Sequence, residues 1–374
     1  MMELIKKTIS KKVSESRISE KTYRNIKNAL SYSALKLYDT DKQSFFKQFI
    51  LNEKKEEKKS DALVLGDLIH TLISGSNFDD KFVTPGIEKP SGQLGDLCEN
   101  MYKVYLQGLN PCNEQLNTFA TIFTEGFQKT KFNWKGEVVA YKGSEEEKVL
   151  PVFMEKGAPY YEELILSTGK TLVFPNQYSQ AENIVNRLKE HPYTMDYINC
   201  KDISDMIEVF DELPFEFEIM EILFKCLFDR VIINHHLKEV QVLDWKTSFD
   251  ADEDNAHYSF LKYGYYIQAG VYMYGIQEFI KKLSEEHNLE GYAILQPKFV
   301  FIDSKNFAAP VILEPSMGDI QIFWENFKVD GRKYSGIANI INDIQWSISN
   351  NVWDQSRELF ENKGHIQLQL NYSA

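Results

Sequence analysis

Apolar and polar positions alternate most clearly in two short runs in the second half of the chain. Residues 225–234 and 239–247 are rich in Val, Ile, Leu and Phe, and the polar run HHLK separates them. Alternation with a period of two is typical of β-strands, and a short polar break between two such runs predicts a β-hairpin. We expect Asn234 to pair with Glu239 across a loop of four residues.

This register brings three charged side chains together. The numbers of paired residues in an antiparallel hairpin have a constant sum, so Asp229 falls directly opposite Asp244. Directly opposite residues share a face of the sheet, with Cβ atoms about 5 Å apart, and Lys246 shares that face because it lies two residues beyond Asp244. A shift of the register by one residue would move Asp229 to the other face, so the prediction depends on the loop.

Two opposed carboxylates repel each other, so a sheet that keeps them together favours a cation between them. Mg²⁺ is the first candidate, because it binds oxygen ligands at about 2.1 Å and retains positions for water and a substrate phosphate. The alternative is an Asp that faces solvent at a strand end beside an ordinary surface pair of Lys246 and Asp244, since D-x-K is a common tripeptide. The apolar setting and the second Asp favour the metal site.

Helical periodicity predicts two buried helices on either side of the hairpin in the sequence. The first, ALVLGDLIHTLIS, carries His70 among apolar residues, and the second spans residues 255–284 with mild interruptions at two glycines. The second presents Tyr265, Gln268 and Tyr272 on one face. A lone His or an aromatic stripe in an apolar helix is usually part of the core, whereas a buried Gln needs a partner for its amide.

The segments FDR at Asp229 and VLDWKTS at Lys246 resemble the core of the PD-(D/E)XK nucleases, most closely the RecB-like and RecE-like exonuclease branch. Two further motifs of that branch recur in the same order, G-x-x-x-H ending at His70 and Q-x-x-x-Y at Gln268 and Tyr272. The resemblance implies an α/β (α+β) fold with a restriction-endonuclease-like core. It implies a mixed central sheet flanked by helices, with a helical insertion.

The resemblance also implies the roles of individual residues. His70, Asp229 and Asp244 are expected to bind the metal, Mg²⁺ or Mn²⁺ in its place, and to form the catalytic centre together with Lys246. The supporting or DNA-contacting residues are expected to be Tyr265, Gln268 and Tyr272. The implied chemistry is attack of a metal-activated water on a phosphodiester, in which Lys246 positions or deprotonates the water and offsets charge in the transition state.

The same branch suggests a biological task. We expect degradation of linear double-stranded DNA from free ends, 5′ to 3′, to generate single strands for recombination. A single-strand annealing protein and a homo-oligomeric assembly are the expected partners. The alternatives are an endonuclease of the restriction or repair type and a catalytically silent DNA-binding scaffold. The intact set of two Asp and one Lys argues against silence, because paired buried charges should be lost first once a site is no longer used.

Composition and charge add limits. The chain of 374 residues is 43% hydrophobic and 26% charged, as expected of a globular protein, and lacks an apolar run of 18 residues or a signal-peptide pattern, so we expect a cytoplasmic protein without a membrane partner. The four cysteines are too scattered for a metal pair, and no iron–sulfur cluster is expected. The net charge of −13 argues against nucleic-acid binding, but residues 1–60 contain fifteen Lys or Arg against eight Asp or Glu. This basic stretch is compatible with a local DNA channel and equally with a solvated arm.

These observations suggest three regions. Residues 1–28 are expected to be a basic N-terminal arm. The nuclease domain is expected at 29–335, with a largely helical insertion at 76–200. A helical C-terminal extension is expected at 336–374.

Overall fold

The computed structural model describes residues 29–53, 60–84, 86–109, 111–116, 118–130, 132–134, 137–139, 146–200, 204–287, 289 and 291–365. The chain divides into two compact units, which we call unit 1 (Met1–Ala62 with Ile184–Ala374) and unit 2 (Leu63–Asn183). The arm expected at residues 1–28 lies outside the described residues. No helix in the described part of the chain is long and apolar enough to cross a membrane.

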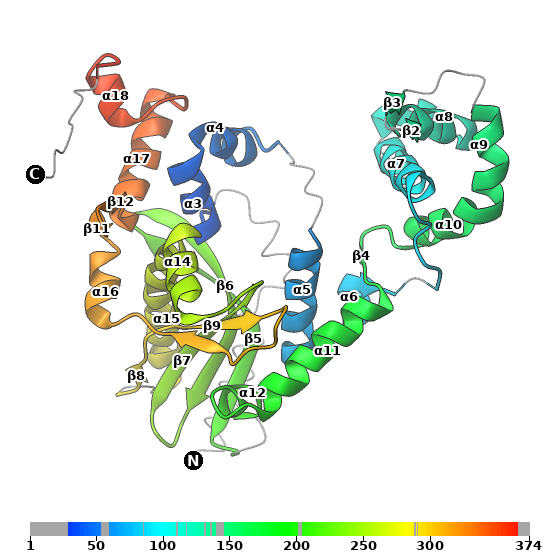
Figure 1. Ribbon diagram of the computed structural model, residues 1–374. Coiled ribbons are helices and arrows are strands. Elements are labelled where there is room, and N and C mark those ends of the chain that lie inside the picture. The colour runs from blue at the N-terminus through cyan, green and yellow to red at the C-terminus, as the bar shows by residue number, and fades with distance from the viewer. Residues whose placement is uncertain are drawn as a thin grey trace, which may run out of the picture. The chain divides into compact units, whose positions relative to one another are not determined.

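Among its described residues, unit 1 contains a six-stranded mixed sheet in the order β10-β9-β7-β6-β5, with β8 beside β7 (Figure 1). The strands are β5 (Ile207–Ile219), β6 (Ile222–Asn234), β7 (Glu239–Ser248), β8 (Ala293–Ile294), β9 (Lys298–Asp303) and β10 (Val311–Leu313). Strands β5, β6 and β7 are antiparallel neighbours, whereas β8 and β9 run parallel to β7. The sheet is therefore mixed, as predicted.

The predicted register of the hairpin is confirmed. Asn234 pairs with Glu239, and the ladder continues to Arg230 opposite Leu243. The side chain of Asn234 closes the loop by accepting hydrogen bonds from the N–H groups of the second and third loop residues. Local side-chain bonding of this kind is typical of Asn in turns.

Beyond Arg230 and Leu243 the two strands of the hairpin part. Strand β6 stays paired with β5, while β7 continues beside β9 as far as Ser248. We call this point the β6–β7 fork. Beyond the fork, the edge of β6 no longer pairs with β7, and Leu30 pairs with part of it instead. Leu30 N donates to Leu223 O at 2.9 Å, and Leu30 O accepts from Lys225 N at 2.8 Å.

Strand β5 differs from the expectation of two extended pieces broken at Pro214. It is continuous, because it is the last strand in the order of the sheet and a Pro there removes no inward ladder bond. The interruption is at Glu212, whose φ of 49° lies in the left-handed region. The pairing with β6 consequently skips Glu212 and Asp229.

The helix expected at residues 255–284 is two helices, α14 (Glu253–Lys262) and α15 (Tyr265–His287). Gly264 separates them at a φ of 69°, a left-handed conformation that ends helices and favours glycine. The expectation of one helix with a mild interruption at Gly264 was wrong, because this glycine ends α14 outright. The break sets the direction in which α15 crosses the sheet.

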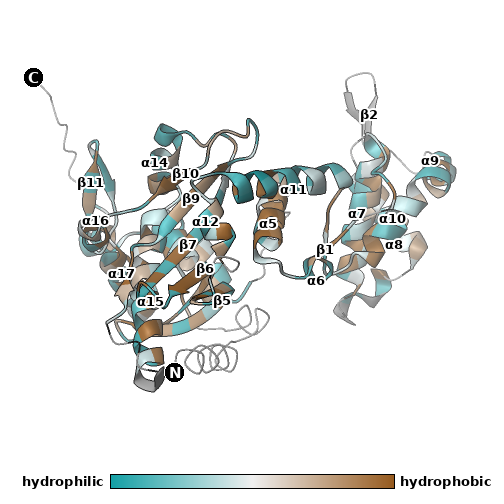
Figure 2. Cartoon of the chain, turned by 90° about the horizontal axis from the view of Figure 1, so that it is seen from below, coloured by the Kyte–Doolittle hydropathy of each residue, from teal (hydrophilic) through white to brown (hydrophobic). Residues whose placement is uncertain are grey.

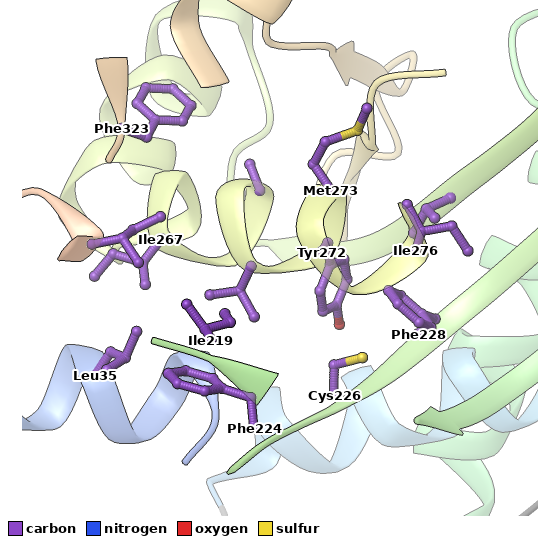
Figure 3. Packing of buried hydrophobic residues seen from close by; sticks show 14 of the residues in the cluster. Leu35, Ile219, Phe224, Cys226, Phe228, Ile267, Tyr272, Met273, Ile276 and Phe323 are labelled. Carbon is purple, nitrogen blue, oxygen red and sulfur yellow. The ribbon is translucent and has the colours of Figure 1, made fainter. Parts of the chain in front are cut away.

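Helix α15 packs against the sheet and forms the main hydrophobic core with it (Figure 3). Buried residues from strands and helix meet there, among them Phe224, Phe228, Val240, Val242, Ala269, Tyr272, Met273 and Ile276. A side chain at Gly275 would place Cβ 2.8 Å from Phe217, so a glycine is required where this helix approaches β5.

The remaining elements of unit 1 complete this core. They are α3 (Tyr32–Thr40), α4 (Lys42–Phe45), η1 (Phe46–Ile50), α12 (Met195–Ile198), α16 (Met317–Ile322), β11 (Phe327–Val329), β12 (Arg332–Tyr334), α17 (Ile337–Asn350) and α18 (Arg357–Glu361). Ser31 caps α3 by accepting a hydrogen bond from Ala34 N, as its sequence predicts. Helix α17 contributes four buried isoleucines to the same core.

Unit 2 is mostly helical and has a hydrophobic core of its own, which includes Cys98, Met101, Phe123 and Phe153. Its elements are α5 (Asp61–Ser74), α6 (Phe78–Lys81), β1 (Phe82–Val83), α7 (Gln93–Gly108), η2 (Pro111–Leu116), α8 (Phe119–Lys129), β2 (Phe132–Trp134), β3 (Glu137–Val139), α9 (Glu146–Val152), η4 (Phe153–Gly157), α10 (Ala158–Leu166), β4 (Thr171–Leu172) and the first part of α11 (Pro175–Glu190). Helix α5 is hydrophobic along most of its length (Figure 2). It was expected to be buried, and Val64, Leu65, Leu68, Ile69 and Ile73 are buried, whereas Leu63 at its start is 58% exposed.

Candidate active site

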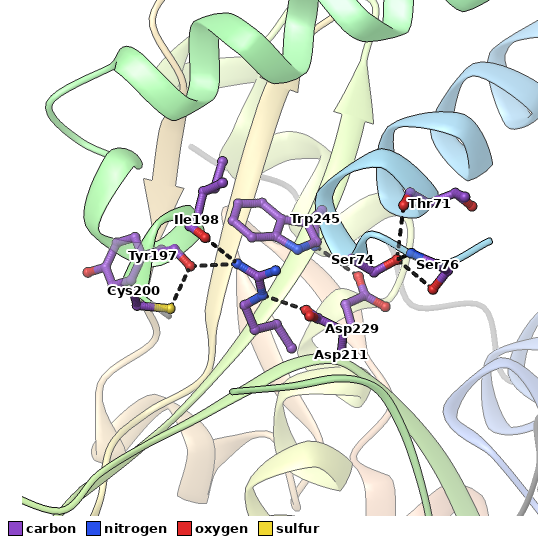
Figure 4. A network of polar contacts seen from close by, with 10 residues as sticks. Thr71, Ser74, Ser76, Tyr197, Ile198, Cys200, Asp211, Asp229 and Trp245 are labelled. Carbon is purple, nitrogen blue, oxygen red and sulfur yellow. Dashed lines mark hydrogen bonds and ion pairs between the residues drawn. The ribbon is translucent and has the colours of Figure 1, made fainter. Parts of the chain in front are cut away.

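Asp229 lies on β6 at the β6–β7 fork. Its Oδ2 accepts a hydrogen bond from Trp245 N on β7 at 2.9 Å, and Figure 4 shows both residues. This bond links the carboxylate of one strand to the backbone of the other at the residue after Asp244. The parting of the strands therefore leaves room for the Asp229 side chain, and the hydrogen bond from Trp245 N orients it.

Asp244 lies across the fork and is 1% exposed. Lys246 Nζ is 2.5 Å from its Oδ2, and Gln268 Nε2 of α15 donates to its Oδ1 at 2.5 Å. Two separate elements, the strand that carries Asp244 and the helix that crosses it, thus hold this carboxylate. The buried Gln that needed a partner has one.

Lys246 lies against aromatic rings as well as against Asp244. Its Nζ is 4.5 Å from the centre of the Tyr265 ring and 6.0 Å from that of Tyr32. Burial alone would lower the pKa of Lys246, but attraction by Asp244, with smaller contributions from Tyr32, Tyr265 and Asp229, raises it. The ammonium group is therefore held as a cation between a carboxylate and two electron-rich rings.

Tyr32 of α3 is a member of this site that sequence reasoning missed. Burial raises the pKa of its phenol, and Lys246 lowers it while Asp244 and Asp229 raise it. Its ring lies 6.0 Å from Lys246 Nζ, and its phenol is within electrostatic reach of both carboxylates of the fork. The sequence signal was weak, because Tyr32 differs from the other aromatic residues of that segment only in following the helix cap Ser31.

Tyr272 supports the site from behind. Its hydroxyl donates to Leu227 O at 2.7 Å, two residues before Asp229, and its ring packs 5.0 Å from that of Phe228. It is 3% exposed, and burial raises the pKa of its phenol well above the usual value. Tyr272 thus anchors β6 to α15 next to the fork.

Arg230, the residue after Asp229, anchors the same strand on its other side. It is 1% exposed, its Nε donates to Asp211 Oδ1 at 2.6 Å, and its guanidinium also donates to the carbonyls of Tyr197 and Ile198 (Figure 4). A buried pair of this kind adds little net stability, but removing one partner leaves an uncompensated charge. This network fixes the backbone of β6 where Asp229 begins the fork.

The residues present fit a hard divalent cation. Asp244 Oδ2 and Gln268 Oε1 are buried and have no hydrogen-bond partner among the described residues, although Lys246 lies in ion-pair contact with the former. In the part of the chain that the structure describes, no group of three or more His, Cys, Asp or Glu gathers at one place. Two carboxylates suit Mg²⁺, which keeps several water ligands and is often held by one or two carboxylates.

The predicted site residues therefore fall into two groups. Asp229, Asp244, Lys246, Gln268 and Tyr265 come together within unit 1, with Tyr272 behind them. His70 lies on α5 of unit 2, and its role as a metal ligand stays a prediction.

A mixed sheet that brings an Asp and a D-x-K sequence together on adjacent strands, with a Gln from the following helix on the second Asp, defines a PD-(D/E)XK nuclease-like domain. A family model described as "PDDEXK-like domain of unknown function (DUF3799)" matches residues 31–292, and the chain belongs to this family. The predicted fold class is thereby confirmed.

Individual proteins tell less about this chain than the family model does. No curated protein matches the chain. The solved structures that match include the crystal structure of a protein from Eubacterium rectale named "putative exonuclease", at 14% identity and a TM-score of 0.42, covering 95% of this chain and 96% of that one.

Proposed function

We propose that this protein is a metal-dependent deoxyribonuclease that hydrolyses phosphodiester bonds. The observation that carries the proposal is the meeting of Asp229, Asp244 and Lys246 at the β6–β7 fork. Membership of a PDDEXK-like family supports DNA as the substrate. Two carboxylates close together repel each other, so their meeting at the point where two strands separate favours a bound cation over a purely structural role.

Asp229 and Asp244 would hold Mg²⁺, or Mn²⁺ in its place. The chemistry that such an ion supplies is activation of water and stabilisation of negative charge on a phosphate. Gln268 keeps Asp244 in one orientation, and the N–H of Trp245 does the same for Asp229. Groups that orient metal ligands in this way typically change metal affinity 10- to 100-fold when they are removed.

Lys246 would act directly on the substrate. Its ammonium group is fixed beside Asp244 and is therefore placed to orient the attacking water and to offset the negative charge that develops on the phosphate in the transition state. The chain needs no covalent intermediate for this hydrolysis. We further propose His70 as a third metal ligand, on the basis of its G-x-x-x-H motif alone.

The finer proposal is an exonuclease. By its resemblance to the RecE-like branch, the protein would degrade linear double-stranded DNA from free ends, 5′ to 3′, and so generate single strands for recombination. A single-strand annealing protein and a homo-oligomer belong to the same proposal.

The test is digestion of linear and covalently closed duplex DNA in Mg²⁺, with EDTA as one control. Asp244→Asn should abolish cleavage, whereas Asp250→Asn, which removes an exposed carboxylate just beyond β7, should not. Loss of linear DNA alone would support the exonuclease, and cutting of the closed circle would favour the endonuclease. If neither DNA is cut, the nuclease proposal is wrong and a DNA-binding scaffold becomes the better explanation.

A further inference from the structure

A row of aromatic rings leads from Lys246 to the surface at the break between α14 and α15. The ring of Tyr265, which lies against Lys246 Nζ, is 6.0 Å from the ring of Tyr263, centre to centre. Tyr263 is 41% exposed and comes directly before Gly264, whose left-handed conformation turns the chain between the two helices. The turn therefore places the accessible ring of Tyr263 next to Tyr265, which in turn contacts Lys246 of the fork.

Two lysines lie against the Tyr263 ring. Lys36 Nζ of α3 is 5.3 Å from the ring centre and Lys262 Nζ of α14 is 5.2 Å from it. Lys262 Nζ is also 5.2 Å from the ring of Tyr258, one helical turn earlier, which is 51% exposed. Rings and ammonium groups thus alternate along this surface in the order Tyr258, Lys262, Tyr263, Lys36.

Neither lysine is neutralised by a carboxylate of the residues that the structure describes. Within the described residues, Lys36 and Lys262 form no ion pair, although Lys246, Lys281 and Lys298 each do. Burial lowers the pKa of Lys36, and the ammonium group of Lys246 lowers it further, so two like charges lie near each other at the end of the row. In a chain with a net charge of −13, unpaired cations beside the carboxylates of the fork favour an anionic ligand.

We propose that Tyr258, Lys262, Tyr263 and Lys36 bind a DNA strand whose bases are unpaired, beside the site of cleavage. An exposed ring stacks on the free face of a base, and only an unpaired, unstacked base offers such a face. The lysines are flexible and can exchange their ring contacts for contacts with the phosphates of the same strand. The location beside a cleavage site rests on the proposed nuclease function, but binding of the strand requires no catalysis.

The first test measures binding of a fluorescent single-stranded oligonucleotide by anisotropy, in EDTA to prevent cleavage, with a blunt duplex for comparison. Tyr263→Ala should weaken binding of the single strand by about 5- to 150-fold, the usual effect of removing one stacked base contact. Tyr263→Phe should retain binding because it keeps the ring. Tyr193→Ala is the matched control, because Tyr193 is 60% exposed and lies outside the row.

The second test measures how salt weakens binding of the same single strand. Lys36→Ala and Lys262→Ala should each reduce the slope of the logarithm of the binding constant against the logarithm of salt concentration by about 0.7, the value for one phosphate contact to a single strand. Lys281→Ala should leave the slope unchanged, because that lysine is paired with Glu278 on the exposed side of α15.

Three outcomes would overturn the inference: no binding of the single strand by the wild type, equal effects of Tyr263→Ala and Tyr193→Ala, or equal loss of single strand and blunt duplex in Tyr263→Ala. These outcomes are separate from failure of the proposed nuclease function. Cleavage in Mg²⁺ combined with normal binding by Tyr263→Ala would refute the strand-binding surface alone. Binding that depends on Tyr263 in a protein that cuts no DNA would support the surface and refute the nuclease.

Discussion

Replacement of Gln268 by Leu should separate the folding role of this side chain from its role in the site. Gln268 is 1% exposed, its Nε2 donates to Asp244, and its Oε1 has no hydrogen-bond partner among the described residues. Loss of a hydrogen bond to a charged group costs about 1.5 to 3 kcal/mol, whereas removal of a buried oxygen without a partner recovers about 1 to 3 kcal/mol. We therefore expect the free energy of unfolding without metal to fall by no more than about 2 kcal/mol.

The effect on the site should be larger. Without Gln268 the Asp244 carboxylate can rotate, and loss of such an orienting group typically weakens metal binding 10- to 100-fold. A ligand stabilises the folded state in proportion to the logarithm of its affinity, so at saturating Mg²⁺ the variant should gain about 1.4 to 2.7 kcal/mol less stability from the metal than the wild type does. Urea unfolding with EDTA and with Mg²⁺ measures both quantities.

The chain offers a matched control for this experiment. Gln241 of β7 is also buried, and its Oε1 has no hydrogen-bond partner among the described residues. Its Nε2 donates to the carbonyls of Val242 and Gln296 instead of to a carboxylate. Gln241→Leu should alter stability without changing the gain from Mg²⁺. If Gln268→Leu and Gln241→Leu gain equally from Mg²⁺, the reasoning that Gln268 orients a metal-binding carboxylate is refuted.

Three further predictions concern other parts of the molecule. Lys246→Ala should reduce DNA cleavage by about 10²- to 10³-fold, the usual effect of removing one charge-stabilising group. DNA binding, measured by anisotropy, should stay largely intact, and a parallel loss of binding would contradict the role of Lys246. Gly264→Ala should lower the free energy of unfolding by about 1 to 2 kcal/mol, because its φ of 69° is unfavourable for Ala while the added Cβ meets only ordinary contacts at 3.5 Å; an unchanged urea midpoint would contradict this. Burial raises the pKa of the Cys98 thiol to about 12, so iodoacetamide at pH 9 should label Cys98 in urea but not in the native protein. Because the folded pKa is above the unfolded value, the stability that wild type holds over Cys98→Ser should decline as pH rises from about 8.5 towards 12.

The register of the hairpin could be predicted from the sequence, because it depends on a short local turn. Asn234 and Glu239 are separated only by the polar loop, and their pairing sets the ladder as far as Arg230 and Leu243. The expected pairing of Asp229 directly opposite Asp244 is not part of this ladder, because the two strands part just before that pair. The partner of the buried Gln268 could also be expected, since a buried amide requires one.

Other features depend on contacts between distant segments, and no local pattern reveals them. Tyr32 lies near Lys246 because the start of the chain pairs with β6 and α3 packs against α15. The hydrogen bond from Trp245 N to Asp229 forms where β6 and β7 part. Gly264 is different, because a glycine after a Lys-Tyr pair at the end of a helical run is a usual helix stop and could have been recognised.

The discontinuous course of unit 1 along the chain has a consequence for its synthesis. The segment that holds Leu30 and Tyr32 leaves the ribosome first, but the strand and helix that receive it follow roughly two hundred residues later. At the usual rate of translation that delay is about 10 to 40 s, long compared with the folding of a helical unit. Unit 2, which is continuous in sequence and has its own core, can fold during this interval. The nascent N-terminal segment therefore waits for its partner strand and helix, and the candidate site forms only after β6, β7 and α15 have been synthesised.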